Sequence, residues 1–181
     1  MRVVHINLDH ASAERLVEVR FLAVSFDIDI LCYSETFRKD DAPFDFPGYV
    51  EYHAPRPLNI MNGGGSLAML VKSTIESHVV CSTYIDEVET LVVQVKLGNK
   101  NLKIAEIYTP PRGNLALRDN TIAHLKDKKG LLLAGDFNAK DAELGTRGPD
   151  NIRGEVLVEQ MRKRKWRMLS SGEHTFVSRV T

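Results

Sequence analysis

Short apolar segments separated by polar turns constrain the fold of this chain more than any other feature of its sequence. The run over residues 28–33 is almost continuously apolar, which is typical of a strand that is buried on both faces. Residues 88–97 are rich in β-branched side chains, and the pair Gly98-Asn99 favours a hairpin turn from them into residues 102–108. Six further strands are predicted over residues 3–7, 49–53, 66–71, 130–134, 166–169 and 175–177.

Apolar residues at helical spacing predict a helix over residues 11–26, with Ser12 as a candidate N-cap. Two more helices are predicted over residues 115–128 and near residues 155–164. Hairpin-connected strands mixed with three helices indicate an α/β protein with a mixed, mostly antiparallel sheet. A chain of 181 residues is long enough for one domain with a real core and too short for two of ordinary size, so we expect a single domain over residues 1–181.

The charges of the chain balance, because 24 Lys and Arg residues stand against 24 Asp and Glu residues. No overall field therefore selects an acidic or a basic partner, and any nucleic-acid binding must come from a local site. Two cysteines are too few for a disulfide framework, and the six histidines do not have the spacing of a zinc site. The first residues lack the apolar core of a signal peptide, and the sequence has no run of 18 uncharged apolar residues. We expect an intracellular protein, nuclear or cytoplasmic, that is neither secreted nor inserted in a membrane.

Polar side chains follow several predicted strands at the point where each strand ends. Strand ends at one edge of a sheet converge in space, and the loops there commonly carry functional sites. Two of these residues are carboxylates placed directly after apolar runs, where burial is costly unless a partner or a metal compensates the charge. Carboxylate and amide oxygens form a set of ligands that suits Mg²⁺. The residues are Asn7, Glu35, Tyr108, Asp136 and Asn138.

Each of these residues also has a plainer interpretation. Asp136 and Asn138 can close a strand with an Asx turn, because both residue types hydrogen-bond their own backbone. Glu35 can start a helix or lie on the surface, Asn7 can be a turn residue, and Tyr108 can be a core aromatic at a strand end.

The strongest charge feature is a basic cluster formed by Arg162, Lys163, Arg164 and Lys165. One interpretation is a helix C-terminus whose cations complement the helix dipole. The other is a patch that contacts nucleic-acid phosphates. The sequence leaves both interpretations open.

Four motifs in register resemble those of the exonuclease–endonuclease–phosphatase superfamily, whose fold is that of deoxyribonuclease I. Gly135-Asp136-Phe137-Asn138 is the superfamily's Gly-Asp-Phe-Asn signature. Ser34-Glu35-Thr36 resembles its Gln-Glu-Thr segment, Tyr108-Thr109-Pro110 its Tyr-x-Pro segment, and Ile6-Asn7 its N-terminal Asn. Finer features are similar to the endonuclease domains of non-LTR retrotransposons, namely Asn7-Leu8-Asp9-His10-Ala11, Asp29-Ile30-Leu31-Cys32, Arg153-Gly154 and His174-Thr175-Phe176.

The resemblance implies a four-layer α/β sandwich, in which two mixed, mostly antiparallel sheets pack face to face with helices outside. It implies Mg²⁺-dependent hydrolysis of DNA phosphodiester bonds, with Mn²⁺ as a substitute metal, and a parent polyprotein that carries a reverse transcriptase; we expect a monomer. Glu35 would be the principal Mg²⁺ ligand with Asn7 beside it, and Asp136 would orient or deprotonate the attacking water. Asn138 and Tyr108 would hydrogen-bond the scissile phosphate. Thr175 and the basic cluster (Arg162, Lys163, Arg164, Lys165) would contact DNA.

One departure from the superfamily pattern leaves other functions open. The superfamily continues past its Thr-Phe segment to a further strand and an Asp-His pair, whereas this sequence stops at Thr181. We therefore expect about four-fifths of the domain, without its last strands. The alternatives are a non-catalytic protein that binds DNA or metal, a phosphoesterase of the same superfamily that acts on a small molecule or lipid, and an unrelated α/β domain.

Overall fold

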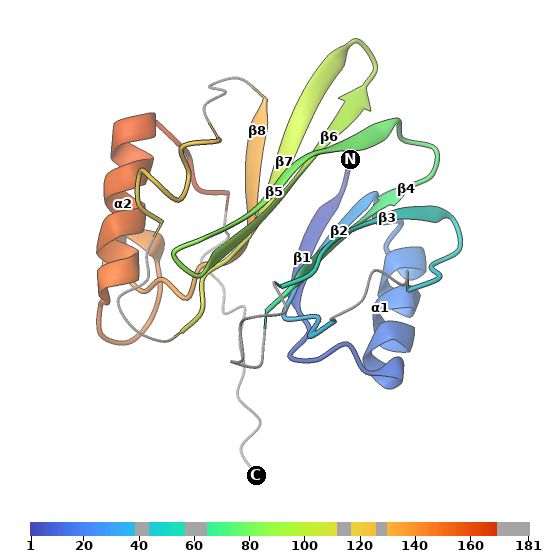
Figure 1. Ribbon diagram of the computed structural model, residues 1–181, viewed down its shortest axis with the longest axis horizontal. Helices are drawn as coiled ribbons and strands as arrows, with labels where there is room; N and C mark the ends of the chain where they lie inside the picture. Colours follow the sequence, from blue (N-terminus) through green and yellow to red (C-terminus); the bar gives the residue numbers. More distant parts are fainter. Residues whose placement is uncertain (39–43, 57–64, 112–116, 126–129, 170–181) are drawn as a thin grey trace.

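Two four-stranded β-sheets lie face to face in the computed structural model, which describes residues 1–38, 44–56, 65–111, 117–125 and 130–169 (Figure 1). The strand order is β1-β2-β4-β3 in the first sheet and β5-β6-β7-β8 in the second. The first sheet contains β1 (Val3–Asn7), β2 (Ile30–Ser34), β3 (Tyr49–Ala54) and β4 (Leu67–Lys72). The second contains β5 (Ser77–Ile85), β6 (Val88–Leu97), β7 (Lys100–Tyr108) and β8 (Leu131–Asp136).

Each sheet has one parallel pair of strands and is otherwise antiparallel. β1 runs parallel to β2, with Asn7 opposite Ser34, and β7 runs parallel to β8, with Tyr108 opposite Asp136. The last paired residues are therefore Asn7, Tyr108 and Asp136, which the sequence singled out, and Ser34, which directly precedes Glu35. The prediction of two mixed, mostly antiparallel sheets is confirmed.

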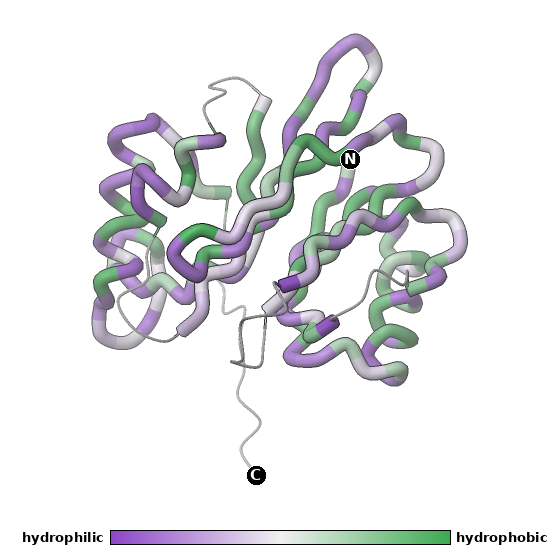
Figure 2. Tube along the Cα trace, viewed as in Figure 1, coloured by the Kyte–Doolittle hydropathy of each residue, from purple (hydrophilic) through white to green (hydrophobic). Residues whose placement is uncertain are grey.

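Helices cover the outer face of each sheet, which gives the four layers of the predicted sandwich (Figure 1). Helix α1 (Ala13–Ser25) packs Val19 and Ala23 against the first sheet. Helix α2 (Ile152–Arg164) contributes Leu157 to the cluster on the outer face of the second sheet. Between the sheets lies a core of ten buried residues, and Figure 2 shows how hydrophobic residues recur along the strands that form it.

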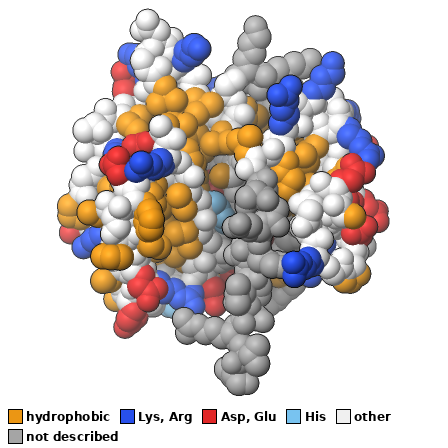
Figure 3. All heavy atoms as spheres, turned by 180° about the vertical axis from the view of Figure 1, so that it is seen from behind, with side chains coloured by type: hydrophobic (Ala, Val, Ile, Leu, Met, Phe, Trp, Pro, Cys, Tyr) orange, Lys and Arg blue, Asp and Glu red, His pale blue; other side chains and the backbone are white. Residues whose placement is uncertain are grey.

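The predicted N-cap of the first helix is confirmed, since the Ser12 hydroxyl accepts a hydrogen bond of 3.3 Å from the Arg15 N–H. The apolar stripe predicted for this helix is only partly buried, however. Phe26 is 61% exposed, and with Val17, Phe21 and Val24 it belongs to the hydrophobic side chains exposed on the α1 side of the molecule (Figure 3).

Two predicted elements differ from the structure, and one observed strand was not predicted. Residues 117–125, predicted as part of a helix, form turns that bury Leu117, Ile122 and Leu125 against the second sheet, so their apolar spacing is satisfied without a helix. Residues 166–169 were predicted as a strand and are irregular, while residues 175–177 lie outside the described residues. Strand β5 was not predicted, because the register shift between Val79 and Cys81 breaks its alternation of polar and apolar residues.

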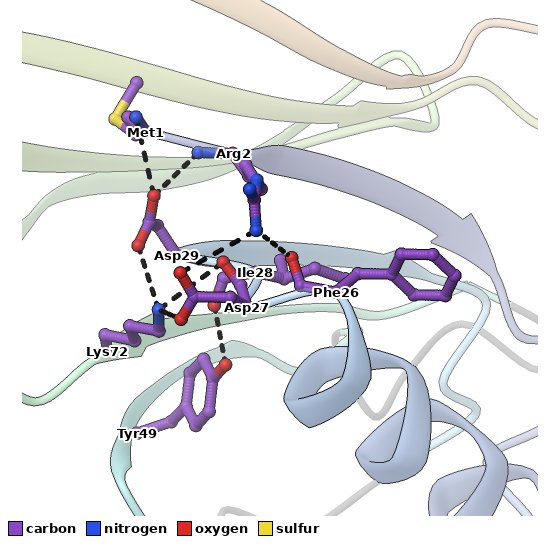
Figure 4. Close-up of polar contacts among 8 residues, drawn as sticks. All are labelled: Met1, Arg2, Phe26, Asp27, Ile28, Asp29, Tyr49 and Lys72. Atoms are coloured by element: carbon purple, nitrogen blue, oxygen red, sulfur yellow. Dashed lines mark hydrogen bonds and ion pairs between the residues drawn. The ribbon is translucent and has the colours of Figure 1, made fainter.

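A polar network closes the turn between α1 and β2 at the end of the first sheet that lies opposite to Asn7 (Figure 4). The Arg2 N–H donates to Asp29 at 2.7 Å, and the Lys72 ammonium donates to the other Asp29 oxygen at 3.1 Å. The Tyr49 hydroxyl donates to the Ile28 carbonyl at 2.6 Å. These contacts join the start of β1, the turn before β2, and strands β3 and β4 at this end of the first sheet. No helix among the described residues is both long and apolar enough to cross a membrane.

Candidate active site

The Asn7 side chain joins the two carboxylates that the sequence singled out. Its amide nitrogen donates one hydrogen bond to Glu35 Oε1 and another to Asp136 Oδ2, each of 2.9 Å. The two carboxylate oxygens are therefore no farther apart than twice that distance. Asn7 and Glu35 come from the first sheet and Asp136 from the second, so the site forms where the two sheets meet. The predicted convergence of these strand ends is observed.

Backbone hydrogen bonds from both sides fix Glu35 just past the end of β2. The Leu8 N–H donates to the Ser34 carbonyl and the His10 N–H to the Glu35 carbonyl, both at 2.9 Å. On the other side the Thr36 N–H donates to the Ser66 carbonyl at 3.3 Å. Glu35 itself has a φ of +53°, a conformation that costs free energy in a non-glycine residue and is commonly found at functional sites.

Asp136 reaches the site because β8 approaches β7 very closely at Gly135. This glycine has a φ of +148°, and a Cβ at its position would overlap the carbonyl oxygen of Ile107. The first residue of the Gly-Asp-Phe-Asn motif is thus required by packing between two strands.

Asn138 connects the Asp136 loop to the loop after β7. Its N–H donates to Asp136 Oδ1 at 3.0 Å, and its side-chain amide donates to the Thr109 carbonyl at 2.9 Å. The first contact is the Asx-type hydrogen bond that the plainer interpretation proposed. Turn formation and placement at the candidate site therefore coincide, because the turn holds both side chains there.

Burial changes the acid–base behaviour of two residues at the site. Burial, followed by the nearby carboxylates of Glu35 and Asp136, raises the pKa of the Tyr108 phenol well above its usual range. Tyr108 therefore keeps its proton and remains a hydrogen-bond donor. Burial lowers the pKa of His5 to about 4, and its Nε2 lies 3.2 Å from the Ser34 hydroxyl. His5 is accordingly neutral near pH 7.

The donor set of the site suits a hard divalent cation such as Mg²⁺. Two carboxylates share one amide donor, which leaves negative charge for a cation to compensate. Among the residues that the structure describes, no group of three His, Cys, Asp or Glu side chains is placed to hold a metal ion. The amide oxygen of Asn7 accepts from the Asp9 N–H at 2.9 Å, so its nitrogen faces the carboxylates. This orientation aligns the carboxylates, and the predicted role of Asn7 beside Glu35 in holding a metal stays a prediction.

The basic cluster does not lie with the carboxylates. Arg162 forms an ion pair with Glu143, and both Lys163 and Arg164 form ion pairs with Asp119. Lys165 is the left-handed C-cap of α2. At 1.5 Å per residue these side chains lie about 16 Å or more along the helix from its N-cap, which is the end that contacts the site. This placement fits the interpretation of the cluster as the basic C-terminus of a helix. Thr175, the other predicted DNA contact, lies outside the described residues.

Two residues at the N-terminus of α2 contact the site but were not predicted as functional. Asn151, the N-cap of α2, donates from its side-chain amide to the Asn138 carbonyl at 3.0 Å, and Arg153 Nε donates to the same oxygen at 2.8 Å. Asn151 could have been found as a capping residue ahead of the helix. Arg153 belongs to the Arg153-Gly154 feature of the resemblance, but no role was predicted for it, because its contacts depend on how α2 packs.

Comparison with known proteins shows the family of the chain. The model of the Endonuclease/Exonuclease/phosphatase family matches residues 6–177. This chain belongs to that family. Its members are hydrolases, typically metal-dependent nucleases or phosphatases.

Individual relatives are similar to the chain over most of its length. The RNA-directed DNA polymerase from the mobile element jockey of Drosophila melanogaster is 28% identical over 164 residues, which cover 89% of this chain. The matched part is 17% of that protein, so the chain spans about one sixth of the length of this curated relative.

Two solved structures share the fold. The endonuclease domain of TRAS1, a telomere-specific non-LTR retrotransposon, superimposes with a TM-score of 0.66 at 15% identity, over 90% of this chain and 70% of that one. An AP endonuclease from Archaeoglobus fulgidus gives a TM-score of 0.59 at 15% identity, over 88% of this chain and 71% of that one. The predicted fold and the predicted resemblance to retrotransposon endonucleases are confirmed.

Proposed function

We propose that this chain hydrolyses phosphodiester bonds of DNA in the presence of Mg²⁺, with Mn²⁺ as a substitute, and so nicks its target. The observation that carries this proposal is the convergence of Glu35 and Asp136 on the Asn7 amide. Phosphodiester hydrolysis requires an attacking water, compensation of charge at the phosphate, and hydrogen-bond donors aimed at the developing charge. The residues gathered at the site can meet these requirements.

Asp136 is the residue that orients the water and accepts its proton. Both of its oxygens are held, Oδ1 by the Asn138 N–H and Oδ2 by the Asn7 amide, so the carboxylate has a fixed direction. A base fixed in this way is more effective than a mobile one, because it does not have to be oriented during the reaction.

Glu35 is the residue that would hold Mg²⁺, with Asn7 beside it. A bound Mg²⁺ supplies positive charge at the phosphate oxygens. The Tyr108 hydroxyl and the Asn138 amide donate hydrogen bonds to the scissile phosphate. One N–H of the Asn138 amide is used by the Thr109 carbonyl, which orients the group.

DNA is the substrate that the relatives favour. The jockey protein is named as an RNA-directed DNA polymerase and the TRAS1 domain as the endonuclease of a retrotransposon. On this basis we also propose that the parent polyprotein carries a reverse transcriptase. Thr175 and the cluster of Arg162, Lys163, Arg164 and Lys165 are proposed to contact DNA, the cluster at a distance from the scissile phosphate.

Nicking of supercoiled plasmid tests the proposal. We expect the chain to convert the plasmid to nicked circles with Mg²⁺ and not with EDTA. Asp136→Ala removes the general base and should reduce the rate by about 100-fold or more. Glu76→Gln is a matched control, because Glu76 forms an exposed ion pair with Lys96 on β6. A folded sample that binds DNA without cleaving it would establish the non-catalytic alternative.

A further inference from the structure

Arg153 lies beside the candidate site and joins the two loops that carry its phosphate-facing residues. Its Nε donates to the Asn138 carbonyl at 2.8 Å, and its Nη2 donates to the Pro111 carbonyl at 3.1 Å. Asn138 belongs to the loop after β8 and Pro111 to the segment after β7. One planar guanidinium thus spans the continuations of the two parallel strands that end in Tyr108 and Asp136.

The backbone that Arg153 contacts is held by several hydrogen bonds. Asn138 has a φ of +44°, in the left-handed region, which asparagine adopts more readily than other non-glycine residues and which its contacts stabilise here. Its carbonyl accepts from both Arg153 and the Asn151 amide. From this conformation the Asn138 N–H reaches Asp136 Oδ1 and its side chain reaches the Thr109 carbonyl.

The start of α2 is itself held tightly against this loop. Asn151 Oδ1 accepts from the Lys140 N–H at 3.1 Å and from the Gly154 N–H at 2.8 Å. A Cβ at Gly154 would overlap the Lys140 carbonyl oxygen, so only glycine permits this approach. Arg153 is therefore presented from a fixed helix end toward two loops. These loops are also joined by the Asn138 amide on the Thr109 carbonyl and by the Thr109 N–H on the Asp136 carbonyl.

We propose that Arg153 is a positioning residue for the reaction proposed above. It acts through Asn138, whose backbone it holds so that the Asn138 amide and the Asp136 carboxylate face the phosphate together. The inference rests on the proposed function, and it requires the two donors of the guanidinium fork. Removal of the fork displaces the loop without removing any group that touches the substrate.

Kinetics of plasmid nicking test this role. We expect Arg153→Ala to lower kcat by about 10- to 100-fold, because small displacements of catalytic groups have effects of this size. KM for plasmid and its salt dependence should remain close to those of the unchanged chain. Arg153→Lys should not restore kcat, because lysine has a single nitrogen in place of the two separate donors, Nε and Nη2, that contact these carbonyls. Free guanidinium, added well below denaturing concentrations, should partly restore the Ala variant, whereas a merely destabilised protein would lose further activity.

Arg20→Ala is the matched control. Arg20 also donates to a loop carbonyl, that of Asp45, at 2.7 Å, but it does so from α1 on the outer face of the first sheet. Its loss should leave kcat unchanged. If Arg153→Ala does not fold, Arg153→Lys carries the test with the same expected loss of kcat. Restored kcat in Arg153→Lys would contradict the requirement for the guanidinium fork, and a raised KM with altered salt dependence would show that Arg153 contacts DNA directly. Either result would overturn the proposal.

An NMR measurement separates this inference from the proposed function. Arg153→Ala should shift the backbone amide and side-chain NH₂ signals of Asn138 and speed their hydrogen exchange, whether or not the chain cleaves DNA. Unchanged Asn138 signals would overturn the positioning role. If the unchanged chain does not nick plasmid, the proposed function fails, and the role of Arg153 in holding the loop is decided by these signals alone.

Discussion

Replacing Glu35 with Gln should abolish stabilisation of the fold by Mg²⁺. The structure places a Glu35 oxygen and an Asp136 oxygen each 2.9 Å from the Asn7 amide nitrogen. Two unit charges about 5 Å apart repel by roughly 1 to 3 kcal/mol at the effective dielectric constant near a protein surface. A divalent cation removes this repulsion, and Gln at position 35 removes one of the two charges while it keeps an oxygen that can accept from Asn7.

The size of the effect follows from mass action. Mg²⁺ at about ten times its dissociation constant stabilises the folded state by about 1.4 kcal/mol. For a chain of this length that corresponds to a rise of roughly 3 to 6 °C in the thermal midpoint. Without Mg²⁺, Glu35→Gln should melt a few degrees higher than the unchanged chain, because the repulsion is relieved.

Thermal unfolding followed by fluorescence, with EDTA and with increasing Mg²⁺, measures both shifts. Glu76→Gln removes a carboxylate from an exposed ion pair on another part of the surface and should keep the full response to Mg²⁺. An equal Mg²⁺ response in Glu35→Gln and in the unchanged chain would refute the assignment of Glu35 as the metal ligand. A lower midpoint of Glu35→Gln in EDTA would refute the argument from repulsion.

Three further predictions concern stability. Gly135→Ala should lower the free energy of unfolding by more than about 3 kcal/mol, because the added Cβ overlaps Ile107 and the φ is unfavourable for alanine. Gly98→Ala, at φ +58° with open space among the described residues, should cost about 1 kcal/mol. Similar urea midpoints for the two variants would contradict this reasoning. Glu106 is fully buried, and burial raises its pKa above the usual 4.5. The folded state therefore holds this proton more tightly than the unfolded state, and the free energy of unfolding falls as the pH rises above 4.5. Glu106→Gln has no proton to lose, so its free energy of unfolding relative to the unchanged chain should increase between pH 5 and pH 8. A difference that stays constant over this range in urea denaturation would exclude this account. Ser12→Ala removes the N-cap of α1 and should cost about 1 kcal/mol, or roughly 2 to 4 °C in the thermal midpoint, with nicking unaffected.

Elements whose signals are local could be predicted from the amino-acid sequence. The β6–β7 hairpin follows from β-branched residues on either side of Gly98-Asn99, and the start of α1 follows from Ser12. The residues at the strand ends could be recognised because each follows its own apolar run. Local patterns succeed in these places because hydrophobic periodicity, capping and turn geometry each involve residues only a few positions apart.

Which of these residues meet, and how, depends on the packing of the folded chain. Asn7 and Asp136 are separated by 129 positions, and their contact exists because the two sheets pack face to face. The same packing directs the Asn7 nitrogen toward the carboxylates, brings Arg153 to Asn138, and carries the basic end of α2 away from the site. It also replaced the expected helix over residues 117–125 with turns, because burial of three apolar side chains against the second sheet outweighed local helix preference. Contacts of this kind depend on the summed burial of many distant residues, which no short stretch of sequence encodes.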